Sequence, residues 1–275
     1  MGKFNAALLQ TRVYDDKERN INNAVELIER VSKEGVDIAV LPEMFCCPYD
    51  NSYFKLFSEE EGGPAFRAVS AAAKESGIYV VAGTIPESEG NMVYNTSYVF
   101  DRSGRQIAKH RKMHLFDIDI EGGQYFKESD TFTPGSEVTV FDTEFCKIGL
   151  AVCYDIRFPE LSRLMAAEGA EVIIIPGAFN MTTGPAHWEL IFRARALDNQ
   201  VYAIGVAPAR DLESSYHSYG NSLVTSPWGN VLSRMDEKEG YIIQEIDPDY
   251  VKKVRNELPL LKHARNDIYT LRKNS

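Results

Sequence analysis

The stretch KEGVDIAVLPE, residues 33–43, predicts a buried strand that follows a helix, because a glycine precedes an apolar run that a proline ends. The same layout returns in AEGAEVIIIPG, residues 167–177. Short apolar runs of this kind are typical of strands covered on both faces in α/β folds. The two stretches predict a layered α/β fold in which one unit is used twice. Chance likeness is the alternative, since buried strands draw on the same few residues.

Two further pairs of stretches keep the same order along the chain. GIYVVAGTIP (77–86) is echoed by QVYAIGVAPA (200–209), and YNTSYVFDRSGRQIAKHRK (94–112) is echoed by YGNSLVTSPWGNVLSRMDE (219–237). No linker rich in Pro, Gly or Ser separates the two halves. We therefore expect one domain over residues 1–275, built of two sheets with helices outside them.

Helix and turn signals lie between the predicted strands. Residues 20–35 and 65–77 have apolar side chains at helical spacing, and each segment ends in glycine. Residues 93–110 predict a hairpin that turns at Ser103–Gly104. The alternation of strand and helix is typical of an α/β domain.

Charge and composition bound the function. The 275 residues carry a formal net charge of −10, which argues against nucleic-acid and anionic-membrane partners because both attract basic surfaces. No apolar run approaches the roughly 20 residues of a membrane helix, and the first residues lack a signal-peptide pattern. The four cysteines suit a reducing compartment and lack metal-ligand spacing. We expect a cytoplasmic protein that acts on a small molecule, with no metal and no cofactor.

The stretch GLAVCYDIRFPEL, residues 149–161, contains the first candidate for chemistry. Cys153 ends an apolar strand and precedes a helix whose start is signalled by Pro159. At such a strand end a thiol is exposed to a substrate, and the backbone N–H of Tyr154 is available to an oxyanion. A buried structural cysteine is the alternative, and this stretch alone does not decide between the two.

Three other charged residues are ambiguous when each is considered alone. Glu43 follows an apolar strand directly, at the end where α/β sites gather, but an ordinary loop glutamate has the same setting. Lys112 belongs to a basic cluster, which is typical of a solvated face. Glu128 has the surroundings of a surface residue.

Arg157 lies four residues after Cys153 and is a candidate for substrate binding. A guanidinium matches a carboxylate in two parallel hydrogen bonds, so Arg157 is suited to hold an anionic substrate. An ion pair with Glu160 or Asp155 is the alternative. Hydroxyl-bearing residues near strand ends are further pocket candidates, with turn capping or loop packing as their structural alternatives: Tyr49, Thr182 and Thr183.

Four motifs, in this order and at these separations, resemble the nitrilase superfamily of carbon–nitrogen hydrolases: LPEMF, HRKMHLFD, YFKES and CYDIRFPEL. The resemblance covers almost the whole chain. It implies a four-layer αββα sandwich with two pseudo-symmetric halves. It also implies homodimers in which the C-terminal tails, here residues 248–275, pack at the subunit interface.

The same resemblance implies roles for the candidate residues. Glu43 becomes the general base, Lys112 the oxyanion stabiliser and Cys153 the nucleophile. Glu128 becomes a second carboxylate near the lysine, and the N–H of Tyr154 joins the lysine at the oxyanion. If Lys112 lies within a few ångströms of the cysteine, it also favours the thiolate.

Within this superfamily the chain is most similar to the omega-amidase branch, through CPYDNSYF, KMHLFDIDI, GAFNMTTGPAHWELIFRARALDNQVY and PARD. That branch implies a small amide as substrate, a monoamide of a short dicarboxylate, with Arg157 on its far carboxylate. An N-carbamoyl amine or amino acid, deaminated glutathione or a nitrile is the alternative substrate. A catalytically silent scaffold is disfavoured because Glu43, Lys112 and Cys153 are all present.

Overall fold

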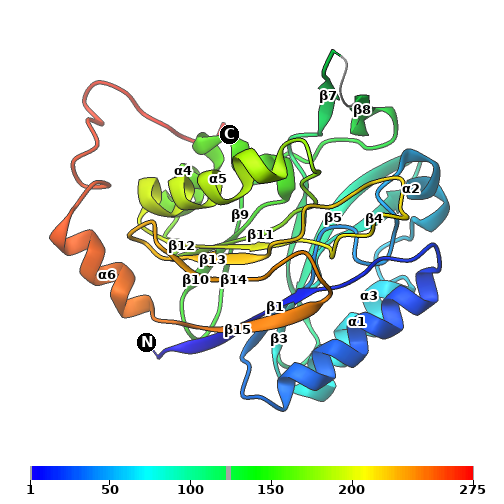
Figure 1. The fold of residues 1–275 in the computed structure, drawn as a ribbon. Coiled ribbons are helices and arrows are strands. Elements are labelled where there is room, and N and C mark those ends of the chain that lie inside the picture. The colour runs from blue at the N-terminus through cyan, green and yellow to red at the C-terminus, as the bar shows by residue number, and fades with distance from the viewer. Residues whose placement is uncertain (1, 122–124, 275) are drawn as a thin grey trace.

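Two twisted sheets lie face to face in the computed structural model, which describes residues 2–121 and 125–274 (Figure 1). The first sheet has the order β15-β1-β2-β3-β5-β4, with β6 paired to β5. Its central strands β1, β2 and β3 run parallel. The strands of this sheet are β1 (Phe4–Gln10), β2 (Ile38–Val40), β3 (Tyr79–Val81), β4 (Ile85–Glu89), β5 (Met92–Phe100), β6 (Gln106–Arg111) and β15 (Gly240–Ile246).

The second sheet has the order β14-β13-β12-β11-β10-β9, and its strands β10, β11 and β12 run parallel. A separate two-stranded hairpin, β7 with β8, projects from the sandwich (Figure 1). The strands are β9 (Thr139–Asp142), β10 (Lys147–Leu150), β11 (Val172–Pro176), β12 (Tyr202–Val206), β13 (Leu223–Thr225), β14 (Val231–Arg234), β7 (Asp117–Asp119) and β8 (Tyr125–Lys127).

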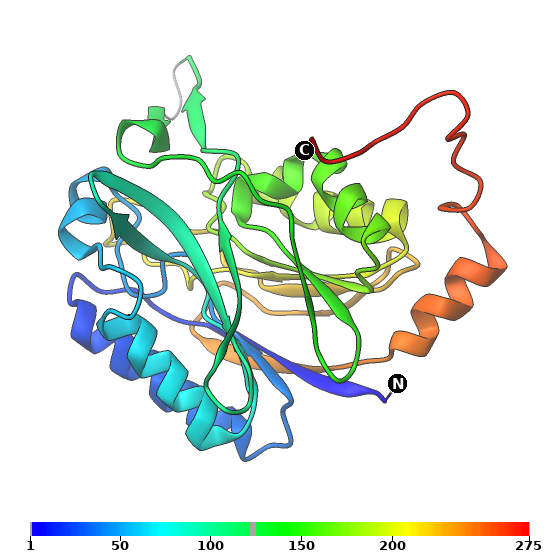
Figure 2. The same cartoon turned by 180° about the vertical axis from the view of Figure 1, so that it is seen from behind.

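Helices cover the outer faces of both sheets, which gives the predicted αββα order of layers (Figures 1 and 2). Helices α1 and α3 lie on the first sheet, and α4 and α5 lie on the second. The helices are α1 (Lys17–Ser32), α2 (Asn51–Phe57), α3 (Pro64–Ser76), α4 (Pro159–Ala167), α5 (Gly184–Asn199) and α6 (Pro248–Glu257), with 3-10 turns η1 (Glu128–Asp130) and η2 (Cys153–Arg157).

Alternation along each strand divides the apolar side chains among three cores. Leu8 and Val40 of the first sheet face Ile174 of the second, in the core between the sheets. Their neighbours point the other way: Leu9 packs under α1 and α3, and Ile173 packs under α4 and α5. Burial on both faces explains why these strands are continuous apolar runs in the sequence.

The prediction of two related halves is confirmed. Both halves run strand, helix, strand, helix, strand and hairpin: β1-α1-β2-α3-β3-β5-β6 in the first, and β10-α4-β11-α5-β12-β13-β14 in the second. The first half inserts α2 and β4 into this order. The two stretches 33–43 and 167–177 therefore occupy matching places, each leading into the second strand of its half.

Two element boundaries differ from the prediction. Helix α1 begins at Lys17 rather than residue 20, because the Asp16 side chain caps it by accepting a hydrogen bond from the Arg19 N–H at 3.0 Å. Strand β10 ends at Leu150, since the chain turns into η2 and Cys153 adopts a φ of 47°.

The C-terminal segment divides into two parts. Val251 and Val254 of α6 are buried, so this helix packs on its own chain. Residues 258–274 arch outward beyond α6 and return toward α4 in both views (Figures 1 and 2), and Lys273 pairs with Glu137. Leu260, Ile268 and Tyr269 of this segment are exposed. Ser275, the last residue of the expected tail, lies outside the described residues. Within the described part of the chain, no helix has both the length and the apolar character needed to span a membrane.

Candidate active site

Four predicted side chains from four separate segments meet at the strand ends of the two sheets. Glu43 follows β2, Lys112 follows β6, Glu128 follows β8 and Cys153 follows β10. The Lys112 Nζ lies 3.0 Å from Glu43 Oε1 and 2.8 Å from Glu128 Oε2. The Cys153 thiol lies close enough to this group for Glu43 and Lys112 to shift its pKa. All four are buried, which excludes a solvated basic face for Lys112 and a surface position for Glu128.

The two carboxylates keep Lys112 charged. Burial lowers the pKa of Lys112, but Glu128 and Glu43 outweigh it and the pKa is raised overall. Burial and the charge of Glu43 raise the pKa of Glu128, although Lys112 opposes them. Further donors hold the Glu128 carboxylate in place: the Phe116 N–H at 2.6 Å and the Tyr49 hydroxyl at 2.5 Å.

The Glu43 carboxylate is held by donors from both halves of the fold. Asn95 of β5 donates from Nδ2 to Glu43 Oε1 at 2.9 Å, and the Ala178 N–H, just after β11, donates to Oε2 at 2.7 Å. These bonds fix the carboxylate beside the thiol. Asn95 was not predicted as a site residue. The sequence does contain a signal for it, because a polar residue interrupts the apolar strand pattern in VYNTSYVF.

The surroundings of Cys153 favour its neutral thiol over the thiolate. Burial and the charge of Glu43 raise its pKa well above the ordinary value, and Lys112 opposes them only in part. Lys112 thus favours the thiolate, as expected, but burial and the charge of Glu43 outweigh its effect. Because Glu43 is among the groups that act on the thiol, it is the candidate acceptor for the thiol proton.

Gly177 makes room for the nucleophile. A Cβ at this position would lie 3.3 Å from Cys153 Cα and 3.3 Å from Trp188 Cζ3, closer than ordinary packing allows. Gly177 is the residue that matches Glu43 in the repeated stretch. Matching positions in the two halves thus have different tasks: Glu43 supplies the carboxylate, and Gly177 leaves space for Cys153.

Asp155 holds the turn that presents Cys153. Its carboxylate accepts from the Val152 N–H at 3.0 Å, and it contacts His110 Nε2 at 3.1 Å and His114 Nδ1 at 2.7 Å. Burial alone would raise the pKa of Asp155, but these partners lower it overall. Asp155 is therefore tied to histidines on either side of Lys112 and does not pair with Arg157.

A small cavity lies against Cys153, and its walls come from η2 and from loops that follow strands of both sheets. Its volume is about 10 Å³, near the minimum that holds one water molecule. The lining residues are Phe116, Cys153, Tyr154, Arg157, Ala178, Phe179, Thr183 and Tyr216.

Arg157 reaches this cavity without a carboxylate partner among the described residues. Its Nη1 lies 3.2 Å from His187 Nδ1, and its guanidinium lies 4.7 Å from the centre of the Phe179 ring. Its Nε is buried and unpaired. The ion pair with Glu160 or Asp155, which the sequence left open, is absent from this part of the chain.

The remaining predicted residues have different places. Tyr154 and Thr183 line the cavity, and the Tyr154 N–H donates to no other described residue. Tyr49 lies on the other side of the carboxylates, against Glu128 and Lys112. Thr182 is exposed and is not brought into the cavity. Sequence reasoning missed Phe116, Phe179 and Tyr216 because their segments, distant in the chain, meet only in the fold.

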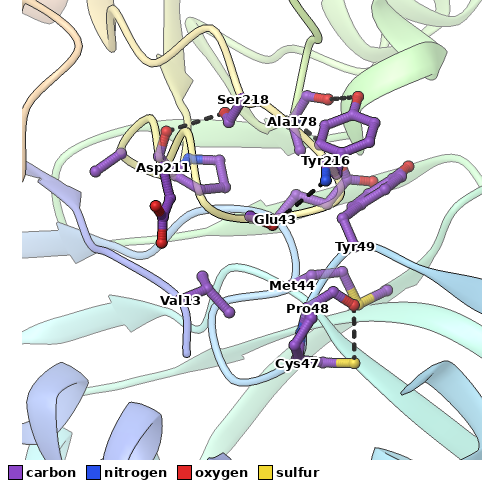
Figure 3. Close-up of a pocket in the computed structure, with 13 residues that line it drawn as sticks. Val13, Glu43, Met44, Cys47, Pro48, Tyr49, Ala178, Asp211, Tyr216 and Ser218 are labelled. Carbon is purple, nitrogen blue, oxygen red and sulfur yellow. Dashed lines mark hydrogen bonds between the residues drawn. The ribbon is translucent and has the colours of Figure 1, made fainter. Parts of the chain in front are cut away.

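A second cavity of about 30 Å³ borders Glu43 and has room for water (Figure 3). Tyr49 and Tyr216 form one side of it, with ring centres 4.6 Å apart, and Val13 and Met44 lie on another side. The Ala178 backbone joins this wall to the Glu43 carboxylate (Figure 3). In the described ranges no group of three or more His, Cys, Asp or Glu side chains is arranged to hold a metal ion.

Comparison with known sequences identifies the family of this chain. The profile of the carbon–nitrogen hydrolase family matches residues 5–256. Omega-amidase NIT2 of Xenopus tropicalis and that of Mus musculus are each 45% identical to this chain over 271 residues, which cover 98% of both partners in each pair. A hydrolase of Schizosaccharomyces pombe is 46% identical over 269 residues, 97% of this chain and 84% of the relative.

Two solved structures share the architecture. Nit3 of Saccharomyces cerevisiae, a member of the nitrilase superfamily, has a TM-score of 0.87 at 40% identity, covering 96% of this chain and 97% of its own. The NitFhit protein of Caenorhabditis elegans has a TM-score of 0.91 at 31% identity, covering 100% of this chain and 68% of its own. The αββα sandwich thus defines the class as the nitrilase superfamily. Within it, the chain belongs to the carbon–nitrogen hydrolase family and is a hydrolase that acts on amides.

Proposed function

We propose that the protein is an omega-amidase, which hydrolyses the terminal amide of short dicarboxylate monoamides to the diacid and ammonia. The substrates are succinamate, glutaramate, 2-oxosuccinamate and 2-oxoglutaramate. One observation carries the choice: Arg157, a cation with no carboxylate partner among the described residues, shares a small cavity with Cys153. A carboxylate at one end of the substrate then places the amide at the other end beside the thiol. The similarity to omega-amidases supports the same choice.

Acylation begins with proton transfer from the Cys153 thiol to Glu43 as sulfur attacks the amide carbonyl. The tetrahedral intermediate carries a negative oxygen, which the Lys112 ammonium and the free N–H of Tyr154 are placed to stabilise. Glu43 then returns the proton to the departing nitrogen, the C–N bond breaks, and ammonia leaves a thioester on Cys153. Glu128 remains a charged partner of Lys112 while Glu43 carries the proton.

Deacylation uses the same carboxylate a second time. Glu43 takes a proton from water, the hydroxide adds to the thioester carbonyl, and the C–S bond breaks to release the acid. The thiolate recovers its proton from Glu43. The cavity of about 30 Å³ beside Glu43 has room for the water that this step consumes.

The deciding experiment measures ammonia release from succinamate, 2-oxoglutaramate, N-carbamoyl-β-alanine and a simple nitrile, with wild type, Cys153→Ala and Arg157→Ala. We expect turnover of the first two that is lost in Cys153→Ala. Arg157→Ala should raise KM for these anions by about 10- to 100-fold, because a charge-assisted pair is lost. Activity confined to the carbamoyl compound would retain the chemistry and overturn the substrate assignment.

We also propose a homodimer whose interface includes the tail, residues 258–274, beyond α6. Its exposed Leu260, Ile268, Tyr269 and Leu271 support this assembly, since exposed apolar groups in one segment are typical of an interface. The four free cysteines support a reducing compartment such as the cytoplasm.

A further inference from the structure

Arg157 differs from the other cations near the site in the kind of partner it has. Lys112 lies between Glu43 and Glu128, and Arg111 forms two hydrogen bonds with the buried Glu87. Each of these charges is matched by a carboxylate. The guanidinium of Arg157 is half-buried and yet meets no carboxylate in the described part of the chain. Its only side-chain hydrogen-bond partner there is the imidazole of His187.

The geometry fixes the protonation state that this contact needs. Arg157 has only donors, so its Nη1, at 3.2 Å from His187 Nδ1, requires a ring nitrogen that accepts. A hydrogen bond between these atoms therefore needs the imidazole with its ring proton on Nε2. The main chain of His187 is fixed because the residue lies in the first turn of α5, where its N–H donates to the Thr183 carbonyl at 2.8 Å.

A second arginine fixes the backbone that carries Arg157. Arg195, also on α5, donates from Nε to the Ile156 carbonyl at 2.8 Å and from Nη2 to the Arg157 carbonyl at 3.1 Å. Helix α5 thus holds both ends of Arg157, its main chain through Arg195 and its guanidinium through His187. These contacts leave few orientations open to the guanidinium.

We propose that His187 is a positioning residue that aims Arg157 at the substrate carboxylate without neutralising it. A neutral acceptor occupies one N–H and leaves the full positive charge, and the remaining donors, to the substrate. An aspartate in the same place would form an ion pair with Arg157 and compete with the substrate for the same fork. The inference rests on the proposed function, since it assumes that Arg157 binds a substrate carboxylate.

Three variants of His187 separate the effect of the hydrogen-bond acceptor from the effect of a negative charge at this position. His187→Leu removes the acceptor, and His187→Asn restores an acceptor near the place of Nδ1. His187→Asp has nearly the same size as His187→Asn but adds a negative charge. We expect His187→Leu to raise KM for succinamate by about 10-fold while kcat changes by less than about 3-fold. His187→Asn should recover most of the wild-type KM. His187→Asp should raise KM at least as much as His187→Leu.

The matched substrate is butyramide, which replaces the carboxylate of succinamate by a methyl group. Because Arg157 has no charge to bind there, the three variants should leave kcat/KM for butyramide within about 3-fold of wild type. In an Arg157→Ala background, His187→Leu should add nothing to KM for succinamate, since a residue that acts through Arg157 has no further effect once Arg157 is gone. Equal losses on both substrates, or additive effects in the double variant, would overturn the proposal.

The outcomes also distinguish a failure of the proposed function from a failure of the role of His187. If wild type hydrolyses neither succinamate nor 2-oxoglutaramate, the proposed function fails. If wild type prefers succinamate over butyramide through Arg157, but His187→Leu matches wild type, only the role of His187 fails. Should His187→Leu fold poorly in a thermal-unfolding control, the comparison of His187→Asn with His187→Asp still decides, because these two side chains have nearly the same size.

Discussion

Lys112 keeps its charge in a buried site because two carboxylates surround it. Of the two, Glu43 has the larger effect on the pKa of the thiol and is the proposed proton acceptor, which leaves Glu128 with an electrostatic task. The division matters for chemistry. A single carboxylate would have to support the ammonium and accept the thiol proton at once, whereas here the charge of Glu128 persists when Glu43 is protonated.

Glu128→Gln should therefore lower kcat by about 10- to 100-fold, since the oxyanion loses part of its cationic partner. Removing one of the two carboxylates that raise the Lys112 pKa lets burial lower it. We expect the alkaline limb of the activity profile to move to lower pH. Steady-state kinetics against pH check this, with the exposed Glu60→Gln as matched control. An unchanged profile would contradict the role of Glu128.

At the level of single residues, sequence reasoning reached the cluster but not its surroundings. Glu43, Lys112 and Cys153 were each ambiguous alone, and the family resemblance joined them. Asn95 and His187 were not predicted as site residues because each acts through a contact with a distant segment. Asn95 in β5 contacts Glu43 after β2, and His187 in α5 contacts Arg157 in η2. Short polar residues in apolar strands look like ordinary variation until the fold shows which atoms they face.

Among the elements, η2 is the part most dependent on a buried charge. It begins at Cys153 with a positive φ, a conformation that costs of order 1–3 kcal/mol at a non-glycine residue. Asp155 compensates by holding the Val152 and His114 N–H groups. Breaking this arrangement should affect both the stability of the fold and the position of the nucleophile.

Asp155→Asn should lower the free energy of unfolding by about 3 kcal/mol and reduce kcat, because a buried charge network loses one member. The folded pKa of Asp155 lies below its ordinary value of 3.8. Its contribution is therefore complete above about pH 4 and is lost as pH falls through the lower folded pKa. Thermal unfolding between pH 2 and 7 should show the gap from wild type narrowing only in acid.

The exposed Asp142→Asn is the control for that series, and it should track wild type at every pH. A gap that widened in acid would show that the charge of Asp155 does not stabilise the fold.

The predicted order of elements was right because periodicity and glycine or proline signals survive in the sequence. Their ends were less predictable: the β10 boundary depends on η2, and η2 depends on a carboxylate network that sequence periodicity does not reveal.

For the whole molecule, the tail beyond α6 is the part that one chain leaves uncovered. A chain ended after Glu257 should dissociate at higher protein concentration than the full chain, because residues 258–274 carry the exposed apolar side chains. Sedimentation velocity over a concentration series checks this. We expect kcat to stay within about 3-fold, since no tail residue lines the cavity at Cys153. A full chain that is monomeric would contradict the assembly.

Strand β1 is the first strand to be synthesised, but one of its two neighbours in the sheet, β15, is synthesised near the end of the chain. Its register partner is β15, so that Phe4 pairs with Ile246. At about 5–20 residues per second, a ribosome needs on the order of tens of seconds to pass from one to the other. During that interval one edge of β1 has no native neighbour, and an open strand edge pairs readily with other chains. Translation that stops shortly before residue 240 therefore leaves a nascent chain prone to aggregation.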